Sequence, residues 1–123
     1  MSDGVLVREL PGGGHEYVLV DRELRALVID GAVTLRFGGT DVEVRGPCTL
    51  RVDGVSHHLD PGAPATLAPL LGCLPASARW LWSGPDGRLT VALMQGQRLE
   101  VPAPGGSTTW TVDGMPATVG RGV

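Results

Sequence analysis

The sequence predicts a mainly β fold in which two related antiparallel meanders form a small sandwich or barrel, with one short helix near residues 65–74. Three observations carry this prediction. Apolar and polar residues alternate with a period of two, glycine-containing turns interrupt the alternation, and one central stretch changes to helical spacing. A chain of 123 residues is the size of one domain. We therefore expect a single domain over 1–123, with a core unit at 24–115 and an N-terminal hairpin extension at 1–21.

The first half contains the clearest alternation. Val33, Leu35 and Phe37 point to one face, and Gly38-Gly39 supplies the next turn because glycine tolerates positive φ. The expected strands of this half, of which the first two form the N-terminal hairpin, are Val5–Leu10, Glu16–Val20, Arg25–Ile29, Val33–Phe37, Asp41–Arg45 and Cys48–Val52.

The central stretch predicts the helix. Its leucines fall at helical spacing, at positions 67, 70, 71 and 74. Asp60 or Thr66 is expected to cap its start, and Pro75 to end it. Pro69 restricts it to a short or kinked helix because proline removes a backbone donor.

The second half returns to period two and echoes the first. Its expected strands are Ala78–Trp82, Arg88–Leu93, Arg98–Val101 and Thr108–Val112. Three triplets recur in the same order, which favours an internal duplication. Val33-Thr34-Leu35 matches Leu89-Thr90-Val91, Val42-Glu43-Val44 matches Leu99-Glu100-Val101, and Val52-Asp53-Gly54 matches Val112-Asp113-Gly114.

The outward faces of the two halves differ in composition. The first carries charges of both signs that can pair across strands, namely Arg36, Glu43, Arg45 and Arg51. The second carries small or apolar residues, including Ala92 and Met94, and Trp80 and Trp82 project to one face while Leu81 points to the other. A strand that is apolar on both faces is normally covered on both. Either the helix or another protein could cover this half, and clustered Trp and Met are typical of interfaces.

Charge and cysteine content restrict the function classes. The net charge is −3, all ten basic residues are Arg, and they are scattered among acids, which disfavours a nucleic-acid partner. No apolar run is long enough for a membrane helix, and Met1–Gly4 lacks the basic start of a signal peptide. We expect a cytoplasmic protein in which Cys48 and Cys73 are buried thiols rather than a disulfide.

Catalytic and metal chemistry have little support. His58 and Asp60 would share a face of an extended segment, a spacing that lets a carboxylate orient an imidazole. They are the candidate catalytic pair, but no nucleophile motif and no third metal ligand accompanies them. Two surface histidines leading to a helix-capping aspartate are the favoured interpretation, and no metal and no cofactor is expected.

A resemblance covers about Leu24 to Met115. The residues that carry it are Gly46-Pro47-Cys48-Thr49-Leu50, Leu59-Asp60-Pro61, Leu67-Ala68-Pro69-Leu70-Leu71, Leu99-Glu100-Val101-Pro102 and Trp110. This order resembles a family of small actinobacterial domains of unknown function. The sequence departs from the family pattern at Cys48, where an aromatic is usual, and between Gly105 and Thr109. The resemblance implies a shared fold unit and a bacterial origin, and it implies no catalytic residue.

Two functions from different classes follow. The first is a non-enzymatic protein-interaction module, a homo-oligomer such as a homodimer or a small regulatory partner protein, which uses the apolar outer face of the second half. The alternative is a small β-barrel that binds an apolar small molecule among Trp80, Trp82 and Trp110 and promotes a reaction by shape alone. A conventional acid–base or metal enzyme comes third, because it depends only on His58 and Asp60.

Overall fold

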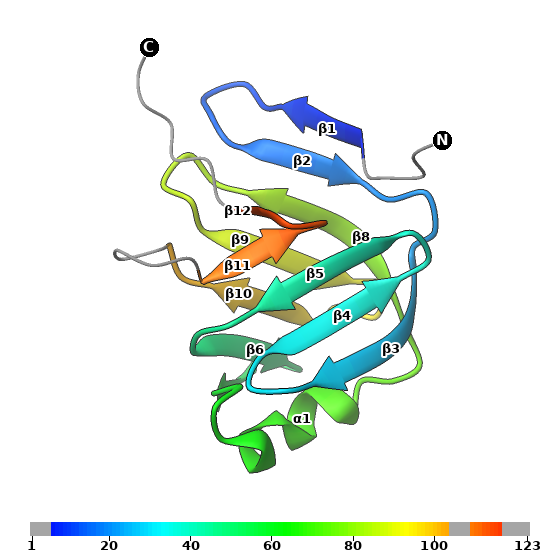
Figure 1. The fold of residues 1–123 in the computed structure, drawn as a ribbon, viewed down its shortest axis with the longest axis vertical. Helices are drawn as coiled ribbons and strands as arrows, with labels where there is room; N and C mark the ends of the chain where they lie inside the picture. The colour runs from blue at the N-terminus through cyan, green and yellow to red at the C-terminus, as the bar shows by residue number, and fades with distance from the viewer. Residues whose placement is uncertain (1–5, 104–108, 117–123) are drawn as a thin grey trace.

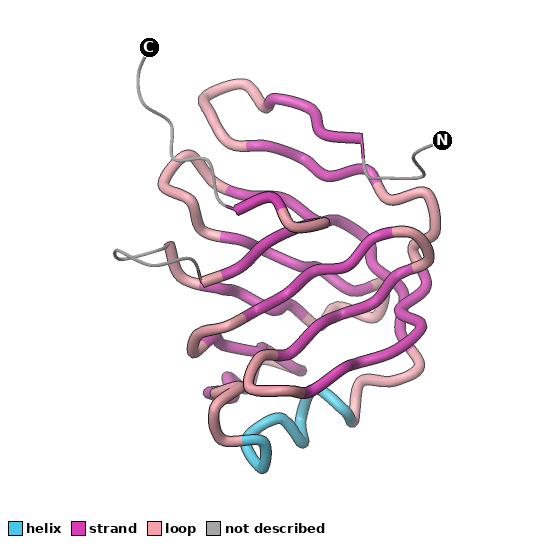
Figure 2. Tube along the Cα trace, viewed as in Figure 1, coloured by secondary structure: helices cyan, strands magenta, loops and turns pink. Residues whose placement is uncertain are grey.

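The computed structural model of the chain describes residues 6–103 and 109–116, apart from the side chains of Met115 and Pro116. The described residues form twelve strands and one helical segment (Figures 1 and 2). The strands are β1 (Leu6–Glu9), β2 (His15–Val18), β3 (Glu23–Ile29), β4 (Val33–Phe37), β5 (Thr40–Val44), β6 (Cys48–Val52), β7 (Val55–Leu59), β8 (Ala76–Ser83), β9 (Leu89–Leu93), β10 (Arg98–Val101), β11 (Trp110–Val112) and β12 (Met115–Pro116). The helical segment comprises the 3-10 turn η1 (Pro64–Leu67) and α1 (Ala68–Leu71). The predicted mainly β class is confirmed.

All strands belong to one antiparallel sheet that folds over on itself. Its order is β12-β11-β5-β4-β3-β8-β9-β10-β6-β7, and the β1–β2 hairpin joins it where β2 pairs with β8. The fold-over occurs between β3 and β8, where Glu23 faces Ser77 and Leu24 faces Ala76. Figure 1 shows β3, β4, β5 and β11 in front of β8, β9, β10 and β6. The arrangement is sandwich-like and not a barrel, because the described strands leave the sheet open, with β12 and β7 at its ends.

The sheet contains two three-stranded meanders, the first formed by β3, β4 and β5 and the second by β8, β9 and β10. Their strands pair in the same register. Ala26 faces Arg36 between β3 and β4, and Trp80 faces Ala92 between β8 and β9. In each meander the first strand has a bulge immediately before this pair, so that Arg25 in β3 and Arg79 in β8 hold equivalent places. The internal duplication itself stays a prediction, because shared register describes geometry and not descent.

Each meander is extended by the hairpin of the other half. Thr111 of β11 faces Glu43 of β5, whereas Thr49 of β6 faces Glu100 of β10. The β6–β7 and β11–β12 hairpins both turn at an Asp-Gly pair with positive φ, at Asp53 (52°) and Asp113 (51°). This exchange of hairpins ties the two halves into one sheet.

One core fills the space between the layers. The alternation predicted from the sequence holds in β4, where the side chains of Val33, Leu35 and Phe37 are buried and Arg36 is exposed. The same cluster takes in Leu50 of β6 together with residues of β5, β9, β10, β11 and the helical segment. At about 25 cal/mol per Å² of buried apolar surface, this cluster is the main source of stability.

The helical segment is shorter than predicted and is capped differently. It ends at Leu71 rather than near residue 74, and its N-cap is Ala63, without a side-chain cap bond. Thr66 instead accepts a hydrogen bond from the backbone N–H of Asp60 at 2.8 Å, and the Asp60 carboxylate accepts one from Gly62. The predicted cap is therefore wrong, because both side chains stabilise the loop before the helix. Within the described residues, no helix is long and apolar enough to span a bilayer.

The N-terminal hairpin is confirmed, although Val5, its predicted first residue, lies outside the described part of the chain, as does Thr108 of the last predicted strand. The hairpin is more than an extension, because Tyr17 and Leu19 belong to the common core. Sequence reasoning did not predict strands at β7 or β12.

Candidate functional site

The outer sides of the two meanders define two surfaces. The ion-pair face lies on β3, β4 and β5 and comprises the outward side chains of Ala26, Val28, Thr34, Arg36, Asp41 and Glu43. The tryptophan face lies on β8, β9 and β10 and comprises those of Trp80, Trp82, Thr90, Ala92, Arg98 and Glu100. The shared register places these residues in equivalent pairs, so that Trp80 corresponds to Ala26 and Arg98 to Asp41.

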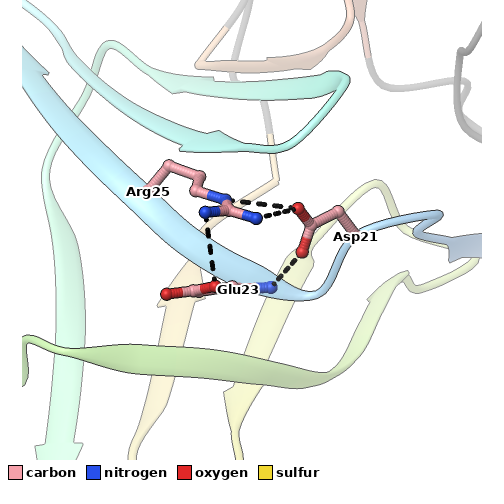
Figure 3. Close-up of polar contacts among 3 residues, drawn as sticks. All are labelled: Asp21, Glu23 and Arg25. Carbon is pink, nitrogen blue, oxygen red and sulfur yellow. Dashed lines mark hydrogen bonds and ion pairs between the residues drawn. The ribbon is translucent and has the colours of Figure 1, made fainter.

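The charges of the first meander are satisfied locally. Arg36 bonds Asp41, which the sequence analysis did not single out, at 3.3 Å across the strands. Arg45 bonds Glu43, two residues earlier in the chain, at 2.9 Å. At the bulge of β3, Arg25 bonds the Asp21 carboxylate at 2.7 Å (Figure 3). These bonds are solvent-exposed and each contributes little to stability.

Figure 3 also shows the second oxygen of Asp21 accepting a hydrogen bond from the backbone N–H of Glu23 at 3.0 Å. The hydrogen bond from Arg25 lowers the pKa of Asp21, and the backbone bond from Glu23 lowers it further. In turn, the hydrogen bond to Asp21 raises the pKa of Arg25. Both charges are therefore maintained at neutral pH, and the exposed guanidinium of Arg25 is already bound.

The tryptophan face has an apolar centre. All residues of β9 are buried, including Thr90 and Ala92, whose side chains point away from the core. Their cross-strand neighbours on β8 are Trp82 and Trp80, and the large indoles beside these small residues account for their burial. Trp80 is itself 47% exposed, and its ring meets that of Trp82 edge to face at 6.4 Å between centroids.

A guanidinium lies over each of these indoles. The Cζ atom of Arg79 is 4.6 Å from the ring centroid of Trp80, and that of Arg98 is 5.8 Å from the ring centroid of Trp82. Both distances are within cation–π range. Arg79 is the extra residue of the β8 bulge and lies over Trp80, the next residue in the chain. Arg98 belongs to β10, and its side chain extends across β9 to Trp82.

Two shallow hollows flank Trp82. One, of about 330 Å³, is lined by Leu10, Glu16, Trp80 and Trp82 and is mostly apolar. The other, of about 250 Å³, is more polar; its lining includes Trp82, Thr90, Arg98 and Glu100. Leu10 and Glu16 reach the first hollow because β2 pairs with β8, where Glu16 faces Trp82. The two hollows form one candidate binding surface with Trp82 between them.

Two predicted site residues lie elsewhere. Trp110 is fully buried between the layers, where its Nε1–H donates to the Gly87 carbonyl at 2.8 Å and its ring meets that of Tyr17 edge to face. It therefore belongs to the core and does not line either hollow beside Trp82. Met94 is 58% exposed in the turn after β9 and lines a separate hollow of about 280 Å³ near Pro75.

The candidate catalytic pair gains no supporting geometry. His58 is exposed on the edge strand β7, opposite Thr49, while the Asp60 carboxylate bonds the Gly62 backbone in the following loop. Among the described residues, no group of three or more His, Cys, Asp or Glu side chains is arranged to hold a metal ion.

Both cysteines are free and buried, as predicted. Burial, and to a lesser degree the nearby Asp60 charge, raises the pKa of the Cys48 thiol to about 11. Burial also raises the pKa of Cys73, whose Sγ lies 3.4 Å from the Pro69 carbonyl. A protonated thiol is a poor nucleophile at neutral pH, so the surroundings of neither cysteine activate it for nucleophilic chemistry.

The comparison with known families covers the candidate surface apart from Leu10. Residues 15–118 match the model of a family of unknown function, DUF6188. The chain belongs to this family. The matched segment starts at β2, so the family includes the strand that supplies Glu16 and the Tyr17 core contact, whereas β1 and Leu10 precede it. No curated protein and no solved structure matches the chain.

Some residues of the tryptophan face and its surroundings could be found from sequence and others could not. Period two places Arg98 and Glu100 opposite the inward Leu99, which is enough to assign them to an outer face. Arg79 breaks this rule because it is the extra residue of a bulge. Leu10 and Glu16 line the hollow beside Trp82 because β2 pairs with β8. These strands are far apart in the sequence, so no local pattern predicts their pairing.

Proposed function

We propose that this DUF6188 protein is a non-enzymatic protein-interaction module whose tryptophan face binds another protein, either a second copy or a small partner. The observation that carries the proposal is the half-exposed Trp80 beside Trp82 and Leu10, on a β-strand surface that the equivalent first meander fills with ion pairs. Exposed tryptophan with a neighbouring arginine is the composition most enriched at binding hot spots.

The shape of the surface supports a protein partner. The two hollows are shallow depressions on either side of Trp82, which suits side chains inserted from an opposing surface. Proteins commonly bind through such central aromatic anchors surrounded by polar residues. Arg79, Arg98 and Glu100 supply a polar rim of this kind around the indoles.

The proposal is tested with the full chain, tagged and purified gently from its own host, and examined by native mass spectrometry. The test variant Trp80→Ala/Trp82→Val installs the residues found at the equivalent places of the first meander. The control variant Arg36→Ala/Asp41→Ala removes the ion pair from the opposite face. We expect a complex that the control retains and the test variant loses, with both variants folded by circular dichroism. A complex retained by the test variant, or a single chain in every sample, would overturn the proposal.

The alternative of an apolar small molecule rests on the hollow of about 330 Å³ beside Trp80 and Trp82, which is at the lower end of the size of ligand sites. Trp110 takes no part in it, so the predicted three-tryptophan pocket is replaced by a two-tryptophan hollow. A small additional mass on the wild-type chain that disappears in Trp80→Ala/Trp82→Val would favour this function over a protein partner.

Two further expectations belong with this proposal. The exchanged hairpins and equal registers support an origin by internal duplication, with the second copy specialised for binding. The two free thiols support a reducing compartment such as the cytoplasm.

A further inference from the structure

The two Arg–Trp contacts of the tryptophan face present donors that nothing in the described structure uses. A guanidinium over an aromatic ring keeps the N–H groups in its own plane free, and that plane matches a carboxylate. Arg79 over Trp80 and Arg98 over Trp82 are two such groups on neighbouring indoles, whose centroids are 6.4 Å apart.

In the part of the chain that the structure describes, the guanidinium groups of Arg79 and Arg98 are unpaired, whereas that of the equivalent arginine in the first meander is not. Arg25, which holds the bulge place equivalent to Arg79, is bound to Asp21 and Glu23. Among the described residues, Arg79 and Arg98 form no ion pair. Arg51, which faces Arg98 from β6, likewise forms none within the described structure. Glu16 and Asp86, which also line the hollows, are already paired with Arg8 and Arg88, so among the described side chains three unpaired arginines stand against one unpaired carboxylate, Glu100. The unpaired charge of this surface is therefore positive, although the chain as a whole has a net charge of −3.

A second copy of the chain related by a two-fold axis complements this surface poorly. In such an interface each patch meets itself, so the unpaired arginines of both copies, with only Glu100 of each copy to offset them, would be brought together. Like charges brought together on burial oppose association. A partner that carries carboxylates around an apolar group satisfies both the arginines and the indoles.

We propose that the tryptophan face binds an acidic protein segment, in which an apolar side chain enters the hollow beside Trp80 and Trp82 and flanking carboxylates pair with Arg79 and Arg98. This inference rests on the proposed function and specifies its partner. Glu100 borders the hollow beside Arg98 and forms no ion pair with the described residues, so it should weaken the binding of an acidic segment.

A library of phage-displayed random dodecapeptides provides the probe. Peptides selected on the immobilised full chain are synthesised, and their affinities are measured for the wild type and for Arg79→Gln, Arg98→Gln, Glu100→Gln and the matched control Arg25→Gln. We expect the selected peptides to combine Asp or Glu with Leu, Ile, Phe or Trp. Each of the first two variants should weaken binding on the order of tenfold, the third should strengthen it about twofold to threefold, and the control should leave it unchanged.

The other outcomes separate this inference from the proposed function. Selection of basic or uncharged peptides that still require Trp80 and Trp82 would overturn the acidic partner and leave the interaction module standing. The same holds if the chain self-associates through these tryptophans and acidic peptides fail to compete. Peptides that bind equally well to Trp80→Ala/Trp82→Val would overturn both. Urea denaturation of every variant ensures that altered affinity reflects the surface and not unfolding.

Discussion

The ion-pair face and the tryptophan face share one backbone register and differ in side chain at equivalent places. Where the first has Ala26 and Val28, the second has Trp80 and Trp82. Where the first has the Arg36–Asp41 ion pair, the second has Ala92 and an arginine that lies over an indole. The first face is satisfied within the chain, whereas the second leaves apolar area and cationic donors for something outside it. This difference is the reason we propose that the tryptophan face is the functional side of a nearly symmetric sheet.

The largest expected effect compares an inward with an outward tryptophan. Trp110→Ala removes a fully buried ring and its hydrogen bond to Gly87, and should lower the free energy of unfolding by about 3–5 kcal/mol. Trp80→Ala, on the half-exposed ring, should cost about 1–2 kcal/mol. Urea denaturation monitored by circular dichroism measures both. Equal losses would mean that Trp80 belongs to the core and would remove the basis of the comparison.

The second-largest expected effect concerns Cys48 and compares two buried positions inside the sheet. Cys48 precedes Thr49 in β6, as Trp110 precedes Thr111 in the equivalent strand β11. Burial raises the pKa of Cys48 from 9.0 to about 11, so the folded chain holds its proton where the unfolded chain releases it. Stability should therefore be complete below about pH 9 and fall on the order of 2 kcal/mol as the pH rises to about 11.

The control for this pH dependence is Cys48→Ala, which removes the titrating thiol and retains Cys73. Its unfolding free energy, measured by urea denaturation between about pH 8 and pH 11, should change less with pH than that of the wild type. Parallel curves for the two proteins would show that the Cys48 thiol is not protected by the fold.

The smallest expected effect is on partner binding, and it distinguishes a substitution at the centre of the tryptophan face from one outside it. Ala92→Arg copies Arg36 of the first meander onto the position beside Trp80, and should weaken partner binding on the order of tenfold by displacing the indole. Met94→Arg, in the separate hollow near Pro75, should change binding less than about threefold. Titration calorimetry with a selected peptide measures both variants. A stronger effect of Met94→Arg would move the contact surface toward the turn after β9.

Much of the fold follows from period two. The strands Val33–Phe37, Cys48–Val52 and Arg98–Val101 have the bounds that alternation predicts, because each buries one face against the core. Val55–Leu59 was missed because Ser56, His57 and His58 give an edge strand no apolar alternation. The helix ended early because the chain bends at Gly72 and Cys73, beyond what leucine spacing records.

The candidate site was predictable only in part. Trp80, Trp82 and Ala92 fall on one face by alternation, and the structure brings them together. Sequence spacing could not separate Trp110 from them, because inward and outward tryptophans have the same local pattern until the strand pairing is known. The two guanidinium contacts depend on a bulge at Arg79 and on the pairing of β9 with β10, and both are tertiary features.

The most direct test of the central claim is hydroxyl-radical footprinting of the tryptophans in the gently purified complex and in the recombinant chain. Trp110, which is fully buried, serves as an internal control that should resist oxidation in both samples. We predict that Trp80 and Trp82 are oxidised in the recombinant chain and protected severalfold in the complex. Equal oxidation of both indoles in the two samples, with protection appearing instead at Val28 of the ion-pair face, would contradict the assignment of the tryptophan face as the binding surface.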